Sequence, residues 1–127
     1  MVKIKAIPRA NPLDAAAQPK FYAHAIADGT ADLERLAYLV SNHSTVRESD
    51  CYAVLKALQF FIIDELNQGR IVKLDNIGSF QIGVRSNGME LADEVSGNTV
   101  RSAHLNFRPA KPLRKMLANV EFKLSNG

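Results

Sequence analysis

The chain has 127 residues, of which 46% are hydrophobic and 23% charged, and its formal net charge is +3. This size fits one domain with a modest core, and no apolar run approaches the length of a membrane-spanning helix. Residues 1–20 carry charges and prolines but no continuous apolar segment, so we expect no secretory signal and a cytoplasmic protein. The single cysteine, Cys51, fits a reducing compartment and is expected to be a buried helix residue rather than a reactive thiol.

The charge is unevenly distributed along the chain. Residues 29–68 hold six acidic and three basic residues, whereas residues 101–127 hold six basic residues and one acidic residue. A basic C-terminal end on an acidic body indicates an anionic partner for one face. A solvated surface that happens to be basic is the alternative.

Two segments near the N-terminus are predicted to be strands. Apolar side chains alternate with lysines from Val2 to Ile7, and Pro8 is expected to end that run. A loop bounded by prolines follows, and Lys20 to Ala27 alternates again before Asp28-Gly29 breaks the pattern. We expect both strands to pair and to cover apolar surface of the remaining chain.

Two amphipathic helices are expected next. Thr30 is a suitable N-cap for the first, whose apolar stripe comprises Leu33, Leu36, Ala37 and Val40. Thr45 and Glu48 have the spacing of a capping box for the second, which is expected to run to about Gln68. Its inward stripe is predicted to be Val54, Leu55, Leu58, Phe61, Ile62 and Leu66.

The second helix is more apolar than one small chain can readily cover. Four consecutive apolar residues run from Phe60 to Ile63, and soluble monomers avoid exposing such patches. Dimerisation through this helix would bury them, with an interface formed by Leu58, Phe60, Phe61, Ile62 and Ile63. The alternative is that the N-terminal strands cover the patch within one chain.

The segment from Gly69 to Val84 predicts a helix end followed by two strands. Gly69 tolerates the left-handed turn that often ends a helix, and Ile71 to Leu74 is β-prone. Asp75-Asn76 supplies a turn, and apolar residues alternate with polar ones from Gly78 onward.

The region from Arg85 to Ala103 contains two candidate turns. Asn87-Gly88 is typical of a two-residue hairpin, and Gly97-Asn98 is a second candidate, so this arm is either one long hairpin or a shorter one with a loop. A strand is expected from Thr99 to Phe107, with Leu105 and Phe107 inward. Pro112 then fits the first turn of a last helix whose buried face is Leu113, Met116, Leu117 and Val120.

Two motifs carry a resemblance to a known family. Ile77-Gly-Ser-Phe80 after a short strand, together with the closing segment Phe107-Arg-Pro-Ala-Lys-Pro-Leu-Arg-Lys115, resembles the HU/IHF family of bacterial histone-like proteins from about Thr30 onward. The two N-terminal strands are similar to the extension of longer HU-related proteins of Bacteroides-like bacteria. The resemblance implies an α+β fold with a helical dimer body, a β-sheet saddle and a β-arm, plus the extension strands. Residues 1–28 would form the extension and residues 29–127 an HU-like DNA-binding domain with its arm at about 84–104.

The same resemblance implies which residues would contact DNA. Arg85 and Arg101 lie where arm cations are expected, and Arg108, Lys111, Arg114 and Lys115 lie in the closing segment that forms the saddle floor. The family's arm-tip motif Arg-Asn-Pro is absent between Arg85 and Ala103, where Glu90, Asp93 and Glu94 would oppose phosphates. Met89 or Leu91 could act as an apolar wedge, with loop packing as the alternative role.

No side-chain constellation in the sequence supports catalysis. His24, His43 and His104 are isolated, and none has metal-ligand spacing with Cys51 or a carboxylate. We therefore expect no catalytic residues, metal, cofactor, membrane association or small-molecule substrate. The sequence predicts a non-enzymatic, HU-like architectural protein of the nucleoid, a homodimer that contacts the phosphates of double-stranded DNA largely without sequence specificity. The alternative is a scaffold or protein-interaction dimer that kept the HU fold and lost tight DNA binding.

Overall fold

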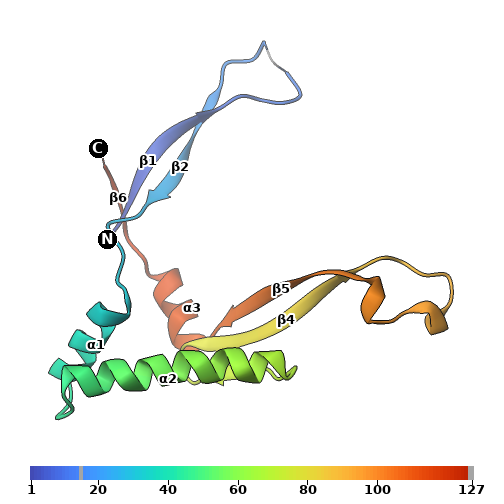
Figure 1. Ribbon diagram of the computed structural model, residues 1–127. Coiled ribbons are helices and arrows are strands. Elements are labelled where there is room, and N and C mark those ends of the chain that lie inside the picture. Colours follow the sequence, from blue (N-terminus) through green and yellow to red (C-terminus); the bar gives the residue numbers. More distant parts are fainter. Residues whose placement is uncertain (15, 126–127) are drawn as a thin grey trace. The chain divides into compact units, whose positions relative to one another are not determined.

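The computed structural model describes residues 1–14 and 16–125, which contain three α-helices and two small sheets (Figure 1). The chain divides into two compact units. One unit combines Met1–Asp32 with the segment that begins at Met116, and the other is the continuous stretch Leu33–Lys115. The second unit is thus inserted into the sequence of the first.

The sheet of the first unit has the strand order β2-β1-β6. Strand β1 (Val2–Arg9) pairs antiparallel with β2 (Lys20–Ile26), which confirms both predicted strands. Pro8, however, lies inside β1 and does not end it. Since β6 pairs only with Val2–Ile4, Pro8 faces no second neighbouring strand among the described residues, and the sheet edge tolerates its missing N–H.

Strand β6 (Phe122–Leu124) was not expected from the sequence. It runs parallel to β1, and the flanking bonds extend the pairing: the Val2 N–H donates to the Glu121 carbonyl at 2.9 Å, and the Ser125 N–H donates to the Ile4 carbonyl at 2.9 Å. The last helix, α3 (Lys111–Ala118), precedes it and ends two residues before Val120, which we had placed on its buried face.

The second unit begins with α1 (Leu33–Asn42) and α2 (Glu48–Asn67), which pack with Ala37 and Cys51 buried. Both helices start two residues later than the predicted N-caps imply. The helix α1 follows Asp32 directly, a residue type as suitable for an N-cap as Thr30. The prediction of a capping box at Thr45 is wrong, because the N-cap of α2 is Arg47, whose side chain makes no capping hydrogen bond. The Ser44 hydroxyl instead accepts the Val46 N–H at 3.2 Å.

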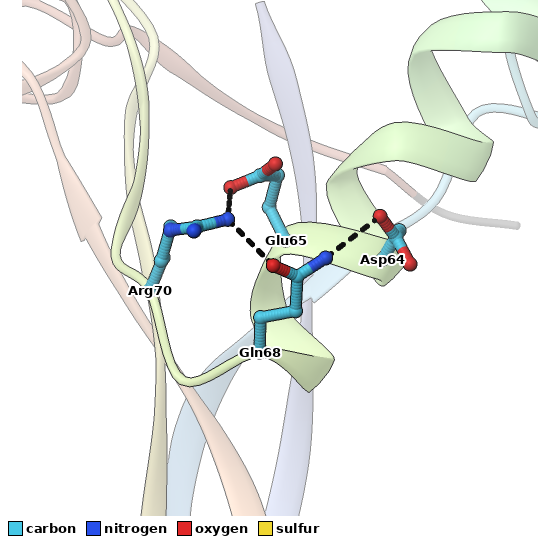
Figure 2. Close-up of polar contacts among 4 residues, drawn as sticks. All are labelled: Asp64, Glu65, Gln68 and Arg70. Carbon is cyan, nitrogen blue, oxygen red and sulfur yellow. Dashed lines mark hydrogen bonds and ion pairs between the residues drawn. The ribbon is translucent and has the colours of Figure 1, made fainter.

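The end of α2 agrees with the prediction. Gly69 has φ +83°, its N–H donates to the Leu66 carbonyl at 3.0 Å, and the Arg70 N–H donates to the Glu65 carbonyl at 3.1 Å. This pair of bonds is a Schellman motif, which satisfies carbonyls that the helix end leaves free. The Arg70 guanidinium then bonds Glu65 at 2.8 Å and Gln68 at 2.7 Å, as Figure 2 shows, and this ties the chain that leaves the helix back to its last turn.

Three strands follow in the order β3-β4-β5: β3 (Val72–Leu74), β4 (Gly78–Ser86) and β5 (Val100–Pro109). The predicted turn joins β3 to β4, with Asn76 at φ 66°. Figure 1 shows β4 and β5 extending side by side into a long loop.

That loop resolves the two alternatives for the arm in favour of a shorter hairpin. Asn87-Gly88 does not form a two-residue turn, because the Asn87 N–H donates to the Thr99 carbonyl at 2.9 Å and the intervening residues form two short 3-10 turns, Ala92–Glu94 and Gly97–Thr99. The Thr99 side chain is buried and donates from Oγ1 to the Ser96 carbonyl at 2.8 Å. Packing of Thr99 therefore overrides the local turn preference of Asn87-Gly88.

The buried core of this chain is small. Among the described residues, the buried hydrophobic side chains are Ala37, Cys51 and Leu66. Val54, Leu58 and Phe61 of the predicted inward stripe of α2 are exposed, as are Met116 and Leu117, which we had placed on the buried face of α3. Their helices bear wider apolar faces than one copy of the chain covers.

Candidate nucleic-acid interface

The sheet β3-β4-β5 separates apolar from polar side chains. Residues paired across β4 and β5 share a face, and Phe80 with Phe107, Ile82 with Leu105 and Val84 with Ala103 make one face apolar. The ring centroids of Phe80 and Phe107 lie 4.9 Å apart. The opposite face bears the alternating partners: Ser79 with Arg108, Gln81 with Asn106, Gly83 with His104 and Arg85 with Ser102.

The apolar face meets α2. Phe60, Ile63 and Leu66 of the helix and Ile82 and Leu105 of the strands line one groove. This groove stays open in the single chain, because Phe60 is 65% exposed and Ile63 68%. Phe61, which is not among the lining residues, is 58% exposed. Leu58 is also exposed and Ile62 is half-buried. Leu105 and Phe107, which we expected to point inward, lie on this face and remain exposed.

Three of the predicted DNA-contacting cations lie at the end of the polar face where β3 pairs with β4. Arg108 lies beside Ser79 in β4, and Lys111 and Arg114 come from the first turns of α3. All three line one shallow depression together with Lys73 and Asp75. Sequence reasoning missed Lys73, although its register opposite Ser79 puts it in line with Arg108 across three strands.

The other three predicted cations lie apart from this depression. Arg85 is on the polar face but near the far end of β4, about 20 Å along the strand from Ser79 at a rise of about 3.3 Å per residue. Arg101 occupies a β-bulge, the extra residue between Ser102, opposite Arg85, and Val100, opposite Ser86. Lys115 follows Arg114 in α3 and is not among the residues that line the depression.

Acidic residues dominate the loop beyond the two arm arginines. Asp93 and Glu94 belong to the first 3-10 turn and Glu90 precedes it, all of them exposed. Met89 and Leu91, the candidate wedge residues, are exposed in the same loop. The arm therefore carries more carboxylates than cations, and the basic depression is the most cationic part of this sheet.

The described residues offer no metal site. No group of three or more His, Cys, Asp or Glu side chains comes together there. His104 lies across Gly83, where a Cβ would meet its Nε2 atom, and His24 lies 2.9 Å from Arg9. No helix among the described residues is both long enough and apolar enough to cross a membrane.

Comparison with known proteins assigns the family. A family model described as an HU domain fused to wHTH, Ig or a glycine-rich motif, HU-HIG, matches residues 1–124. The chain belongs to the HU-HIG family. This confirms the resemblance to HU-type proteins drawn from Ile77–Phe80 and the closing segment.

Two solved structures share this fold of the HU-HIG chain. A putative DNA-binding protein from Bacteroides vulgatus has a TM-score of 0.64 at 14% identity, covering 96% of this chain and 47% of its own. This chain therefore spans about half the length of that protein. Anabaena HU in a cocrystal with DNA has a TM-score of 0.55 at 22% identity, covering 70% of this chain and 99% of its own. A search of curated proteins found no match.

Proposed function

We propose that this chain is a non-enzymatic architectural protein that binds the phosphates of double-stranded DNA as an HU-like homodimer, largely without sequence specificity. The observation that carries the proposal is the depression of Lys73, Arg108, Lys111 and Arg114 on the polar face of a sheet whose other face is apolar. Membership of an HU-domain family and likeness to an HU protein that was crystallised with DNA support it. Such a role would place the protein with the nucleoid.

The dimer is the second part of the proposal. The exposed residues Phe60 and Ile63 line the open groove with Ile82 and Leu105, and the exposed ring of Phe61 contacts that of Phe60. A second copy is the partner that would cover this apolar surface. Two copies would form a helical body, with the two basic depressions as the floor of a saddle and the two β4–β5 hairpins as its arms. Residues 1–28 would be an extension added to this HU-like domain.

A salt-dependent gel shift on random-sequence duplex tests the phosphate contacts. Each neutralised phosphate contributes about −0.9 to the slope of log K against log salt, so Lys111→Ala/Arg114→Ala should reduce the magnitude of the slope by about 1.8 per copy, or about 3.6 for the dimer, and weaken binding equally for all sequences. Lys56→Ala, a cation on α2, is the control and should change neither quantity. Binding as tight as the parent's in the double variant would exclude the depression as the site.

The scaffold alternative is favoured by one observation, the carboxylates of Glu90, Asp93 and Glu94 in the arm loop. If the arms approach DNA, these charges repel phosphates, and Glu90→Gln/Asp93→Asn/Glu94→Gln should tighten binding and steepen the salt slope. If neither parent nor variant binds duplex at low salt, the scaffold function is the correct one.

A further inference from the structure

The sheet of the first unit also sorts its side chains by charge. Strand register places Arg9 opposite Lys20, Lys5 opposite His24, and Lys3 opposite both Ile26 and Lys123, so all five cations of these strands share one face. The other face holds no charged strand residue. It is formed by Val2, Ile4, Ala6, Pro8, Phe21, Ala23, Ala25, Phe122 and Leu124.

Four of the five cations are available to an anion. Lys5, Arg9, Lys20 and Lys123 are exposed and form no ion pair within the described part of the chain, whereas Lys3 pairs with Asp28 at 3.2 Å. The Arg9 guanidinium lies 2.9 Å from Nε2 of His24, a contact that holds it along the sheet face. The nearby carboxylate of Asp14 accepts the Ala16 N–H of its own loop.

Arg9 and Lys20 form a like-charge pair directly opposite each other across β1 and β2. Such a pair destabilises a sheet, and here no carboxylate of the described residues offsets it. A bound anion would remove this repulsion. The depression beside the pair is lined by Asn11, Gln18, Tyr22 and His24 as well, side chains that hydrogen-bond phosphate oxygens.

We propose that the β1–β2 ribbon is a second DNA-contacting arm, which binds the sugar-phosphate backbone through Lys5, Arg9 and Lys20. This inference rests on the proposed DNA-binding function. Residues 2–26 hold four cations and one carboxylate, whereas residues 84–104 hold two cations and three carboxylates, so the ribbon has the charge that the β4–β5 hairpin lacks. A two-stranded ribbon also fits the major groove of DNA, which is about 12 Å wide.

An anionic membrane is the competing partner, and the distribution of side chains disfavours it. Membrane-surface elements place apolar side chains toward the acyl chains with cations at the level of the headgroups. Here Phe21, Phe122 and Leu124 lie on the face opposite the cations, so a sheet lying on a membrane could not use both sets at once.

The test uses the full chain, random-sequence duplex and the charge-neutralising variant Arg9→Gln/Lys20→Gln. The matched control, Arg47→Gln/Lys56→Gln, removes two cations, one at the N-cap of α2 and one within that helix. For each copy whose ribbon contacts the duplex, we expect the ribbon variant to lower the magnitude of the salt slope by about 1.8 and the affinity at 0.1 M salt by roughly tenfold to a hundredfold, which gives a slope change of about 3.6 when both copies of the dimer make the contact. The control should keep the parent's slope. The melting temperature of the ribbon variant should equal or exceed the parent's, because the repulsion between Arg9 and Lys20 is gone.

Three outcomes would overturn the inference. If the ribbon variant has the same salt slope as the control, the β1–β2 ribbon does not contact DNA, and the proposal for the Lys111/Arg114 depression still stands. Ribbon-dependent sedimentation with phosphatidylserine vesicles, with DNA binding unchanged, assigns the face to membranes. Absence of any duplex binding by the parent at low salt overturns both proposals. A slope change in the ribbon variant but none in Lys111→Ala/Arg114→Ala supports the ribbon and refutes the depression.

Discussion

Gly78 is buried where β4 begins, opposite Pro109 of β5. A Cβ at this position would collide with the carbonyl oxygen of Arg108 and would lie 2.7 Å from ring atoms of Phe107. The glycine thus lets two strands approach at the point where one sheet face holds an aromatic pair and the other holds a cation.

We expect Gly78→Ala to lower the free energy of unfolding by about 1–3 kcal/mol, because Arg108 and Phe107 must shift to admit the methyl group. Urea denaturation measures the loss. Gly88→Ala is the control, since a Cβ there meets nothing within 4 Å, and it should change stability by no more than about 0.5 kcal/mol. Equal stability of the two variants would show that the strands do not approach this closely.

Residues of the candidate site could be predicted when one sequence motif contained them. Residues that come together only through the pairing of strands could not. Arg108, Lys111 and Arg114 lie within seven residues of one another, so the closing segment was sufficient to group them. Lys73 joins them only through the pairing of β3 with β4, and Arg9 faces Lys20 across an intervening loop. A sequence read without strand register cannot show such neighbours.

Among the elements, the start of α2 separates two interpretations of Thr45. A capping box would make Thr45→Ala cost about 1 kcal/mol, whereas the observed N-cap at Arg47 leaves the Thr45 side chain without that role. We therefore expect Thr45→Ala to change the thermal unfolding midpoint by less than Ser44→Ala, which removes the acceptor of the Val46 N–H. A larger loss for Thr45→Ala would restore the capping box.

Elements with a strong repeating pattern were predictable from the sequence, and those set by distant contacts were not. Alternation gave β1, β2, β4 and β5, and Gly69 marked the end of α2 within one residue. The strand β6 has three residues, too few for a period of two to stand out, and it exists because β1 offers it an edge. The predicted turn at Asn87-Gly88 does not form, because the Asn87 N–H bonds the carbonyl of Thr99, whose buried side chain closes the loop instead.

For the whole molecule, Phe61 distinguishes a monomer from the proposed dimer. At 58% exposure in the single chain, Phe61→Ala should cost little if the protein is monomeric. Burial against a second copy would instead make it cost about 3–5 kcal/mol. We expect the larger value, with sedimentation equilibrium showing twice the chain mass for the parent and dissociation toward single chains for the variant. A folded monomeric parent would contradict the dimer.

The pairing of Val2 with Phe122 has a consequence for how the protein is made. Contacts between residues so distant in sequence are slow to form, because the chain between them must first be ordered. During synthesis, the β1–β2 hairpin leaves the ribosome before its third strand and stays without it until Phe122–Leu124 has also been made. Throughout this interval the edge of β1 at Val2–Ile4 is an unpaired template for other nascent chains. The positive charges of Lys3 and Lys5 on that strand repel neighbouring copies. Lys5, which we assign to DNA in the finished protein, would thus also protect the incomplete chain from aggregation.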